Sequence, residues 1–295
     1  MEFIFWLTAV LLTLIILLIY ETRRRRATLL ATVDVVSLPA FASQALGNSR
    51  EITVFLPPGY AQVGNRRYPT LYVNDGQDQE ALQLRETLAK LFQRQQLPPI
   101  IVVAVPTNDE RLHEYGTAVC PNAQNLGTKA GEYGRFLTTE LMPAINQQFH
   151  TSQDPTETGI FGVSLGGLSA FDIAWNHPDL FGIVGVMSGS FWWRAAADEV
   201  VMPPNQLIAH EMVRQTTEKP ALRLWFEAAT QDEASDRDNN GIIDAIQDTL
   251  ELVEELEKIG FSRGMDVAYV EVPGGRHNYD TWAELFPHFL RWAFG

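Results

Sequence analysis

A serine set between two glycines, Gly162-Val163-Ser164-Leu165-Gly166, is the group of residues in this sequence with the clearest capacity for chemistry. A short apolar run precedes it and an amphipathic, alanine-containing segment follows it, which predicts a strand, a sharp turn and a helix. Such a turn holds the serine in a strained backbone conformation at the N-terminal end of the helix, and side chains at 162 or 166 would collide with neighbouring backbone. The pattern predicts Ser164 as a nucleophile; a purely structural glycine turn is the alternative interpretation.

A serine hydroxyl is a weak nucleophile, so Ser164 requires a base and an acid that orients the base. After a serine turn of this type the acid comes next along the chain and the histidine last, each in a loop behind a strand. His277 lies in a glycine-containing loop between the last predicted strand and the last predicted helix, and we predict that it is the base. Asp232 follows another predicted strand and is our candidate acid, with Glu233 as the alternative. A solvated loop carboxylate is the other interpretation of either acid.

Backbone amides near the serine should stabilise the negative charge that develops on the reacting carbonyl oxygen. The amide of Leu165 lies in the first turn of the predicted helix, where it has no partner within the helix. A second amide should come from the loop after the strand predicted over 70–73, from Gly76 or Gln77, and Gln77 is our oxyanion-hole candidate.

Short, apolar segments rich in β-branched residues alternate with helical segments through most of the chain. This alternation predicts an α/β fold, with a doubly wound, mostly parallel sheet and helices on both faces, in one domain over residues 41–295. The predicted strands are residues 51–56, 70–73, 100–105, 158–161, 183–187, 222–227 and 266–272. The predicted helices are residues 80–95, 132–148, 168–176, 242–259 and 282–292.

The N-terminal segment differs from the rest of the chain. Residues 3–20 are uncharged and almost wholly apolar, and they approach the length of about 20 residues that a helix needs to cross a bilayer. The arginines at 23–26 follow the apolar run, whereas a cleaved signal peptide carries its positive charges before it. We therefore expect a transmembrane helix as a membrane anchor over residues 1–26 and a linker over 27–40. By the positive-inside rule, the protein would lie in the cell membrane with its catalytic domain on the cytoplasmic side.

The overall charge and the cysteine count exclude two classes of protein. A formal net charge of −14, without a basic patch, argues against binding of nucleic acid. Cys120 is the one cysteine of the sequence, so no intrachain disulfide can form, and we interpret it as a partly buried thiol.

An acidic loop beside the candidate acid is similar to the start of a calcium-binding loop. Its oxygen-bearing residues are Asp236, Asp238, Asn240 and Asp244. Gly241 permits the sharp turn, but position 12 is Gln247 instead of the bidentate glutamate of an EF-hand. We predict a structural Ca²⁺ outside an EF-hand that stiffens the loop of Asp232; a solvated acidic turn is the alternative. A weak calcium site would favour an extracytoplasmic domain, against the argument from the arginines.

Several further segments resemble the putative esterase family of α/β-hydrolases, which includes esterase D, ferric enterobactin esterases, feruloyl esterases and mycolyltransferases. These segments follow one another in the family's order over residues 43–293, and they are residues 50–60, 68–73, 133–146, 177–182 and 188–192 together with the serine turn. The resemblance implies the α/β-hydrolase fold, with Ser164, Asp232 and His277 as nucleophile, acid and base. Ala229 departs from the pattern, because many members have glycine in the acid loop.

Together these residues predict a serine esterase that hydrolyses a small-molecule carboxylic ester through an acyl-enzyme and needs no cofactor for catalysis. Two alternatives stay open at this point. One is acyl transfer to an alcohol by the same triad, and the other is a binding protein that keeps the fold without the catalysis.

Overall fold

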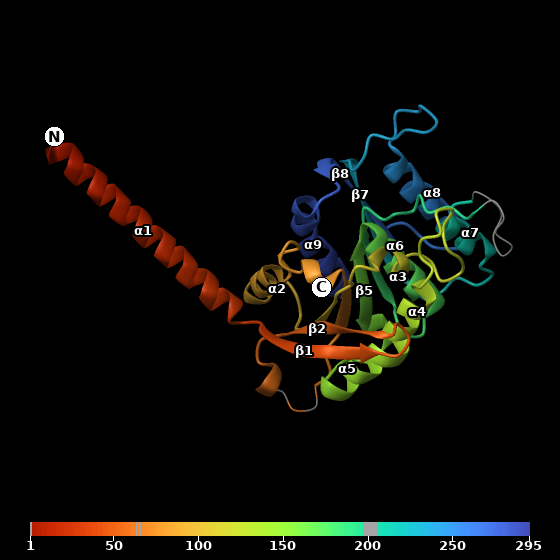
Figure 1. Ribbon diagram of the computed structural model, residues 1–295, viewed down its shortest axis with the longest axis horizontal. Helices are drawn as coiled ribbons and strands as arrows, with labels where there is room; N and C mark the ends of the chain where they lie inside the picture. Colours follow the sequence, from red (N-terminus) through yellow and green to blue (C-terminus); the bar gives the residue numbers. More distant parts are fainter. Residues whose placement is uncertain (1, 63, 65, 197–205) are drawn as a thin grey trace.

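Among the residues that the structure describes, a single eight-stranded sheet forms the centre, in the strand order β1-β2-β4-β3-β5-β6-β7-β8 (Figure 1). The computed structural model describes residues 2–62, 64, 66–196 and 206–295. β1 pairs antiparallel with β2 and β2 with β4, whereas all other neighbouring strands are parallel. The strands are β1 (Asp34–Ser43), β2 (Asn48–Leu56), β3 (Thr70–Asn74), β4 (Ile101–Val105), β5 (Thr158–Val163), β6 (Ile183–Met187), β7 (Arg223–Gln231) and β8 (Val267–Arg276).

Helices cover both faces of this sheet, as predicted (Figure 1). On one face, Leu88 of α2 and Phe286 of α9 belong to the same buried cluster as Val73 of β3. On the other face, α4 to α8 bury their apolar side chains, such as Leu168 of α6, against residues such as Tyr72 of β3. The helices are α1 (Glu2–Leu30), α2 (Leu84–Gln93), α3 (Arg111–Glu114), α4 (Ala130–Arg135), α5 (Met142–Gln148), α6 (Ser164–Asn176), α7 (Ile208–Gln215), α8 (Asp244–Lys258) and α9 (Tyr279–Phe294).

All the predicted strands are present, and their ends differ most where the site lies. β7 continues to Gln231 and β8 to Arg276, so each strand reaches the residue before the candidate acid and the candidate base. α6 begins at Ser164, four residues before the predicted start at 168. The helix predicted over 132–148 is divided by a π-helical segment, Phe136–Leu141, that precedes Pro143. Proline has no N–H to continue an α-helical ladder, which accounts for the change of geometry.

The predicted linker over 27–40 is wrong. These residues contain the end of α1 and most of β1, which forms an antiparallel hairpin with β2. β1 is at the edge of the sheet and half exposed, so its sequence lacks the continuous apolar run of the buried strands. A bulge interrupts its pairing between Leu38 and Phe41, at Pro39 and Ala40, where Ala40 has a φ of 55°.

α1 extends away from the sheet and brings only its C-terminal end to α2 (Figure 1). The residues predicted as a transmembrane segment, 3–20, are helical as expected. In the part of the chain that the structure describes, however, no helix has both the length and the apolar character needed to cross a membrane. The transmembrane assignment of this helix is therefore not supported.

Candidate active site

Ser164 is the first residue of α6 and follows β5 directly. Its φ of 54° is left-handed, which is a strained conformation for a serine and is typical of a sharp strand-to-helix turn. A Cβ at Gly162 would lie 2.1 Å from the carbonyl oxygen of Gly166, so the predicted collision with backbone is confirmed there. A Cβ at Gly166 would instead meet a side-chain oxygen first, Oδ2 of Asp75, at 2.6 Å.

His277 reaches Ser164 from the loop between β8 and α9. Its Nε2 lies 2.9 Å from Ser164 Oγ, which is hydrogen-bond distance and suits transfer of the hydroxyl proton. Asn278 begins α9 by accepting a hydrogen bond from the amide of Thr281, and this cap fixes the chain next to the histidine. The His277 ring packs edge-on against Trp282 with 5.1 Å between ring centroids, and its side chain stays 40% exposed. The base is thus held in place but open to water.

Asp232 lies on the other side of the histidine ring. Its Oδ1 is 3.7 Å from His277 Nδ1, which is an ion-pair distance and too long for a hydrogen bond. The carboxylate is almost completely buried and accepts hydrogen bonds from the Ala229 amide (3.1 Å) and from Ser188 Oγ (3.0 Å). Glu233, the alternative acid, is exposed at the rim of the site. The structure therefore brings Ser164, His277 and Asp232 together in one row.

The two oxyanion-hole candidates lie at helix starts. Leu165 is the second residue of α6, so its amide has no partner within the helix. Gln77 lies in a short 3-10 helix after β3, η2 (Gly76–Asp78). Asp75 precedes this turn with a left-handed φ of 56°, and Arg111 binds its carboxylate with two hydrogen bonds, at 2.7 and 2.8 Å. The side chain of Gln77 also donates to Asp75, at 3.0 Å, so the loop is fixed from two sides.

Sequence reasoning missed a second layer of polar residues behind Asp232. Ser188 follows β6 and donates to Asp232, while Glu227 of β7 is fully buried beside it. Burial, and secondly the charge of Asp232, raise the pKa of Glu227 to about 8. A signal for this layer exists in the sequence, because Glu227 is a carboxylate among the apolar residues in the middle of β7. Burial of an ionisable group is costly unless the group has polar partners.

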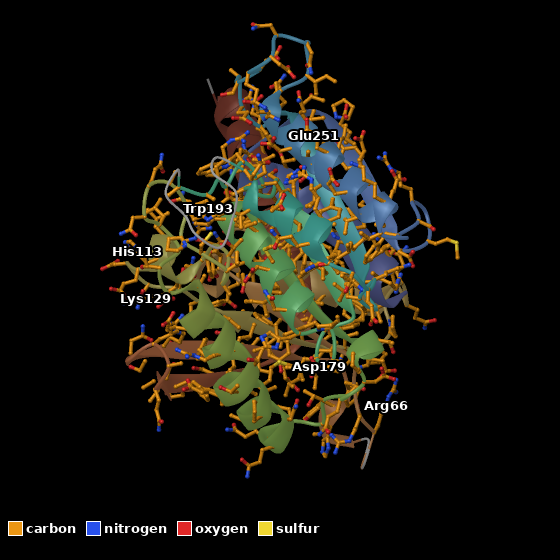
Figure 2. The ribbon with its side chains drawn as sticks, turned by 90° about the vertical axis from the view of Figure 1, so that its right-hand side faces the viewer. Arg66, His113, Lys129, Asp179, Trp193 and Glu251 are labelled. Carbon is orange, nitrogen blue, oxygen red and sulfur yellow. The ribbon has the colours of Figure 1, made fainter. Side chains whose placement is uncertain are left out.

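A cavity of about 200 Å³ opens beside this row of residues. Trp192 lines it and is 45% exposed. The neighbouring Trp193, labelled in Figure 2, is 1% exposed and belongs to the core. The residues around the cavity are Ser188, Gly189, Trp192, Asp232, Glu233, Ala245 and His277. A larger cavity of about 630 Å³ lies between α1 and α2, but its lining includes no serine or histidine. Space for a small apolar or aromatic group is therefore available next to the candidate base.

The predicted calcium loop is closed by its own hydrogen bonds. The Asp236 carboxylate accepts from the amides of Asn240 (3.0 Å) and Gly241 (2.9 Å), and Asp238 accepts from the Gln247 side chain (3.0 Å). Nowhere in the described residues, which include this whole loop, are three His, Cys, Asp or Glu side chains arranged to hold a metal ion. In this arrangement donors of the chain itself occupy the carboxylates of Asp236 and Asp238, and the calcium site stays a prediction on which no catalytic step depends.

The guanidinium group of Arg237 lies at the end of this loop. Arg237 Nη1 is 2.7 Å from Asp248 Oδ1 and 3.4 Å from Asp244 Oδ1. Its Nη2 is 3.5 Å from Glu251, which projects from α8 (Figure 2). Burial raises the pKa of Asp248 to about 6, and the guanidinium opposes that rise. Arg237 therefore neutralises carboxylates at the start of α8 that would otherwise repel one another.

Comparison with known proteins identifies relatives of this chain. The sequence profile described as "Putative esterase" matches residues 43–293. "Uncharacterized protein YbbA" from Bacillus subtilis (strain 168) is 24% identical over 257 residues, which are 86% of this chain and 96% of that protein. The iron(III) enterobactin esterase of Escherichia coli (strain K12) is 30% identical over 154 residues, which are 51% of this chain and 35% of that protein.

A solved structure shares the fold. The enterobactin esterase FES from Shigella flexneri, in the presence of 2,3-di-hydroxy-N-benzoyl-glycine, superimposes with a TM-score of 0.64 at 22% sequence identity. The match covers 88% of this chain and 59% of that one. The family profile covers nearly everything that follows α1, including the serine turn, the acid loop and the histidine loop. This chain therefore belongs to the Putative esterase family and has an esterase-like α/β fold.

Proposed function

We propose that this protein is a serine esterase that hydrolyses a small-molecule carboxylic ester through an acyl-enzyme. The observation that carries the proposal is the 2.9 Å contact between Ser164 Oγ and His277 Nε2 at the start of α6. Membership of an esterase family supports the same reaction class.

In the first half-reaction His277 Nε2 takes the proton of Ser164 Oγ as that oxygen bonds to the ester carbonyl carbon. The carbonyl oxygen becomes an oxyanion, which the amides of Leu165 and Gln77 stabilise together with the positive end of α6. His277 then gives the proton to the leaving alcohol as the C–O bond breaks. Water, activated by the same imidazole, attacks the acyl-enzyme and releases the acid and the free serine.

Asp232 stabilises the imidazolium that forms during both half-reactions. Its carboxylate is buried and held by two hydrogen bonds, so it keeps a fixed orientation toward Nδ1. A modest rotation of the exposed His277 ring would shorten the 3.7 Å contact to a hydrogen bond once a substrate is bound. The charge that Asp232 supplies acts in a partly dehydrated site, where it has a larger effect than in water.

The test uses the full-length chain, a fluorophosphonate probe and a set of p-nitrophenyl esters of short and aromatic acids. We expect labelling and turnover in the wild type and the loss of both in Ser164→Ala, with at least a hundredfold loss of kcat in His277→Ala. His150→Ala, at an exposed histidine whose ring packs against Tyr60, is the matched control and should behave as the wild type. Full turnover by a folded Ser164→Ala protein would refute the proposal.

Acyl transfer by the same triad is separated from hydrolysis in this assay. The exposed side chain of His277 gives water direct access to the base, which favours hydrolysis. Addition of methanol or glycerol at about 1%, where water remains in large excess, should therefore leave the free acid as the main product. A dominant ester product at that concentration would indicate an acyltransferase.

A further inference from the structure

Ser188 lies at the centre of the buried polar layer behind Asp232. Its hydroxyl is 3.0 Å from Asp232 Oδ1 and 3.4 Å from Glu227 Oε2, and the indole Nε1 of Trp282 donates to it at 2.9 Å. Ser188, Glu227 and Trp282 are each at most 5% exposed. The proposed mechanism uses the hydrogen bond from Ser188 only as one of the two contacts of the Asp232 carboxylate, and it assigns no task to Glu227 or Trp282.

The backbone of Ser188 supports a specific task for its side chain. Its φ of 46° is left-handed, which costs free energy in a residue with a Cβ. Its amide donates to the Glu227 carbonyl oxygen (2.9 Å) and to Glu227 Oε2 (3.2 Å), so the strained conformation is held by the neighbouring strand. The result is a hydroxyl aimed at the carboxylate that faces the catalytic histidine.

The protons available on each group fix the direction of these hydrogen bonds. The Trp282 indole can only donate, so Ser188 Oγ accepts from it and keeps one proton to give. The shorter of its two carboxyl contacts is to Asp232, so that proton goes to Asp232. Glu227 then completes the set as a neutral carboxylic acid, which can donate to Ser188 in turn; an ionised Glu227 would compete with Asp232 for the Ser188 proton and repel its charge.

We propose that Ser188 is a positioning residue that holds the Asp232 carboxylate toward His277, and that buried Glu227 supports it in the neutral form. This inference rests on the proposed function, because it concerns the acid of the same triad. The layer acts through Asp232 and does not touch the substrate carbonyl or Ser164.

The groups around Glu227 determine when it ionises. Asp232 lies after the same strand, Tyr269 and Glu271 come from β8, and His277 lies beyond Asp232. Tyr269 stays neutral, because burial and then Glu271 raise its pKa well above the ordinary value. Among these groups His277 alone can carry a positive charge. In the mildly alkaline range, ionisation of Glu227 should place a second negative charge beside Asp232. The ionised Glu227 would compete with Asp232 for the Ser188 proton, and this should lower the rate.

The experiment measures kcat and KM from pH 5.5 to 10 for the wild type, Ser188→Ala and Glu227→Gln. Ser188→Ala should lower kcat about tenfold at pH 7 with KM changed less than about twofold, since one hydrogen bond to a charged group is lost. Glu227→Gln imitates the neutral acid, so it should keep kcat at pH 7 within about threefold. It should also remove the decline of kcat/KM near pH 8 that we expect for the wild type.

Controls separate positioning from folding. Ser43→Ala removes another buried serine hydroxyl, which accepts one amide hydrogen bond at 3.0 Å on β1, and should leave kcat unchanged. Asp172→Asn removes a different buried acid and should leave the decline near pH 8 in place. Circular dichroism confirms that each variant is folded.

The outcomes distinguish this inference from the proposed function. If Ser164→Ala is inactive but Ser188→Ala turns over as fast as the wild type, or Glu227→Gln retains the alkaline decline, the positioning role is refuted and the serine mechanism stands. If Ser164→Ala retains full turnover, both proposals fail.

Discussion

Replacing Arg111 with alanine should leave the Asp75 carboxylate buried without its cation and loosen the loop that carries the Gln77 amide. The guanidinium binds that carboxylate through two hydrogen bonds, at 2.7 and 2.8 Å. The Asp75 side chain is 2% exposed and that of Arg111 31% exposed, so water can replace the lost cation only in part. Gln77 and Thr107 still offer neutral donors to Asp75, at 3.0 and 3.5 Å.

The size of the effect follows from these exposures. Removing one partner of a fully buried ion pair costs about 3–5 kcal/mol of the free energy of unfolding. Screening at the exposed edge of Arg111 and the remaining donors reduce this to about 2 kcal/mol. Loss of a complete oxyanion donor lowers kcat about a hundredfold or more, and a loosened loop keeps part of that donor. We therefore expect kcat of Arg111→Ala to fall about tenfold, with little change in KM.

Urea denaturation and ester turnover measure the two effects on the same variants. Asp75→Asn in the Arg111→Ala background removes the unpaired charge and should recover about 1 kcal/mol relative to additive single changes. Arg135→Ala, at an exposed arginine that pairs with Glu132 within α4, is the control and should cost less than about 0.5 kcal/mol. Strictly additive effects of the two substitutions, or an unchanged kcat in Arg111→Ala, would refute the reasoning.

Three further predictions concern the framework of the site. Gly162→Ala should prevent folding or destabilise the protein by more than about 3 kcal/mol, because the new Cβ would lie 2.1 Å from a backbone oxygen. Soluble yield and thermal melting test this prediction, and a wild-type melting temperature would contradict it. Tyr279→Phe removes the 2.9 Å hydrogen bond to Asp78 that joins the histidine loop to the oxyanion loop. It should lower the free energy of unfolding by about 1 kcal/mol and lower kcat a few-fold in the turnover assay. No change in stability or in kcat would show that the two loops are not coupled. Burial raises the pKa of Asp172 from 3.8 to about 7, so between these pH values the native state holds a proton that the unfolded state has lost, and stability falls as pH rises. The free energy of unfolding should fall by at most about 4 kcal/mol over this range, and Asp172→Asn should flatten the fall. Urea denaturation at pH 5 and pH 7 measures the change in stability for both proteins. An equal change in the wild type and in Asp172→Asn would count against a raised pKa of Asp172.

The buried strands and the row of candidate residues could be read from the sequence because their signals are local. A parallel strand buried on both faces is a short apolar run, and β6 agrees with its predicted bounds, 183–187, at both ends. The glycines around Ser164 have steric causes within a few residues, and Gly162 would collide with Gly166 in the same turn. His277 is predicted from the chain order together with its loop after the last predicted strand.

The features that sequence reasoning missed depend on distant contacts. β1 is exposed on one side and is recognisable only by its pairing with β2. α3 has four residues, too few for a periodic pattern. Ser188 reaches Asp232 across 44 positions of the chain, and the distance from Trp282 to Ser188 is 94 positions. Such long-range contacts leave no periodic pattern in a single sequence. The buried position of Glu227 does indicate that it has a polar partner.

The bulge in β1 has a consequence for the protein at high concentration. An edge strand with a free row of N–H and C=O groups can pair with the edge of another sheet, which leads to aggregation. Pro39 has no N–H to offer to an incoming strand, and the left-handed Ala40 turns the chain out of the regular register. A second copy could therefore pair with at most a few residues of β1 on either side of the bulge, and the sheet ends with this strand.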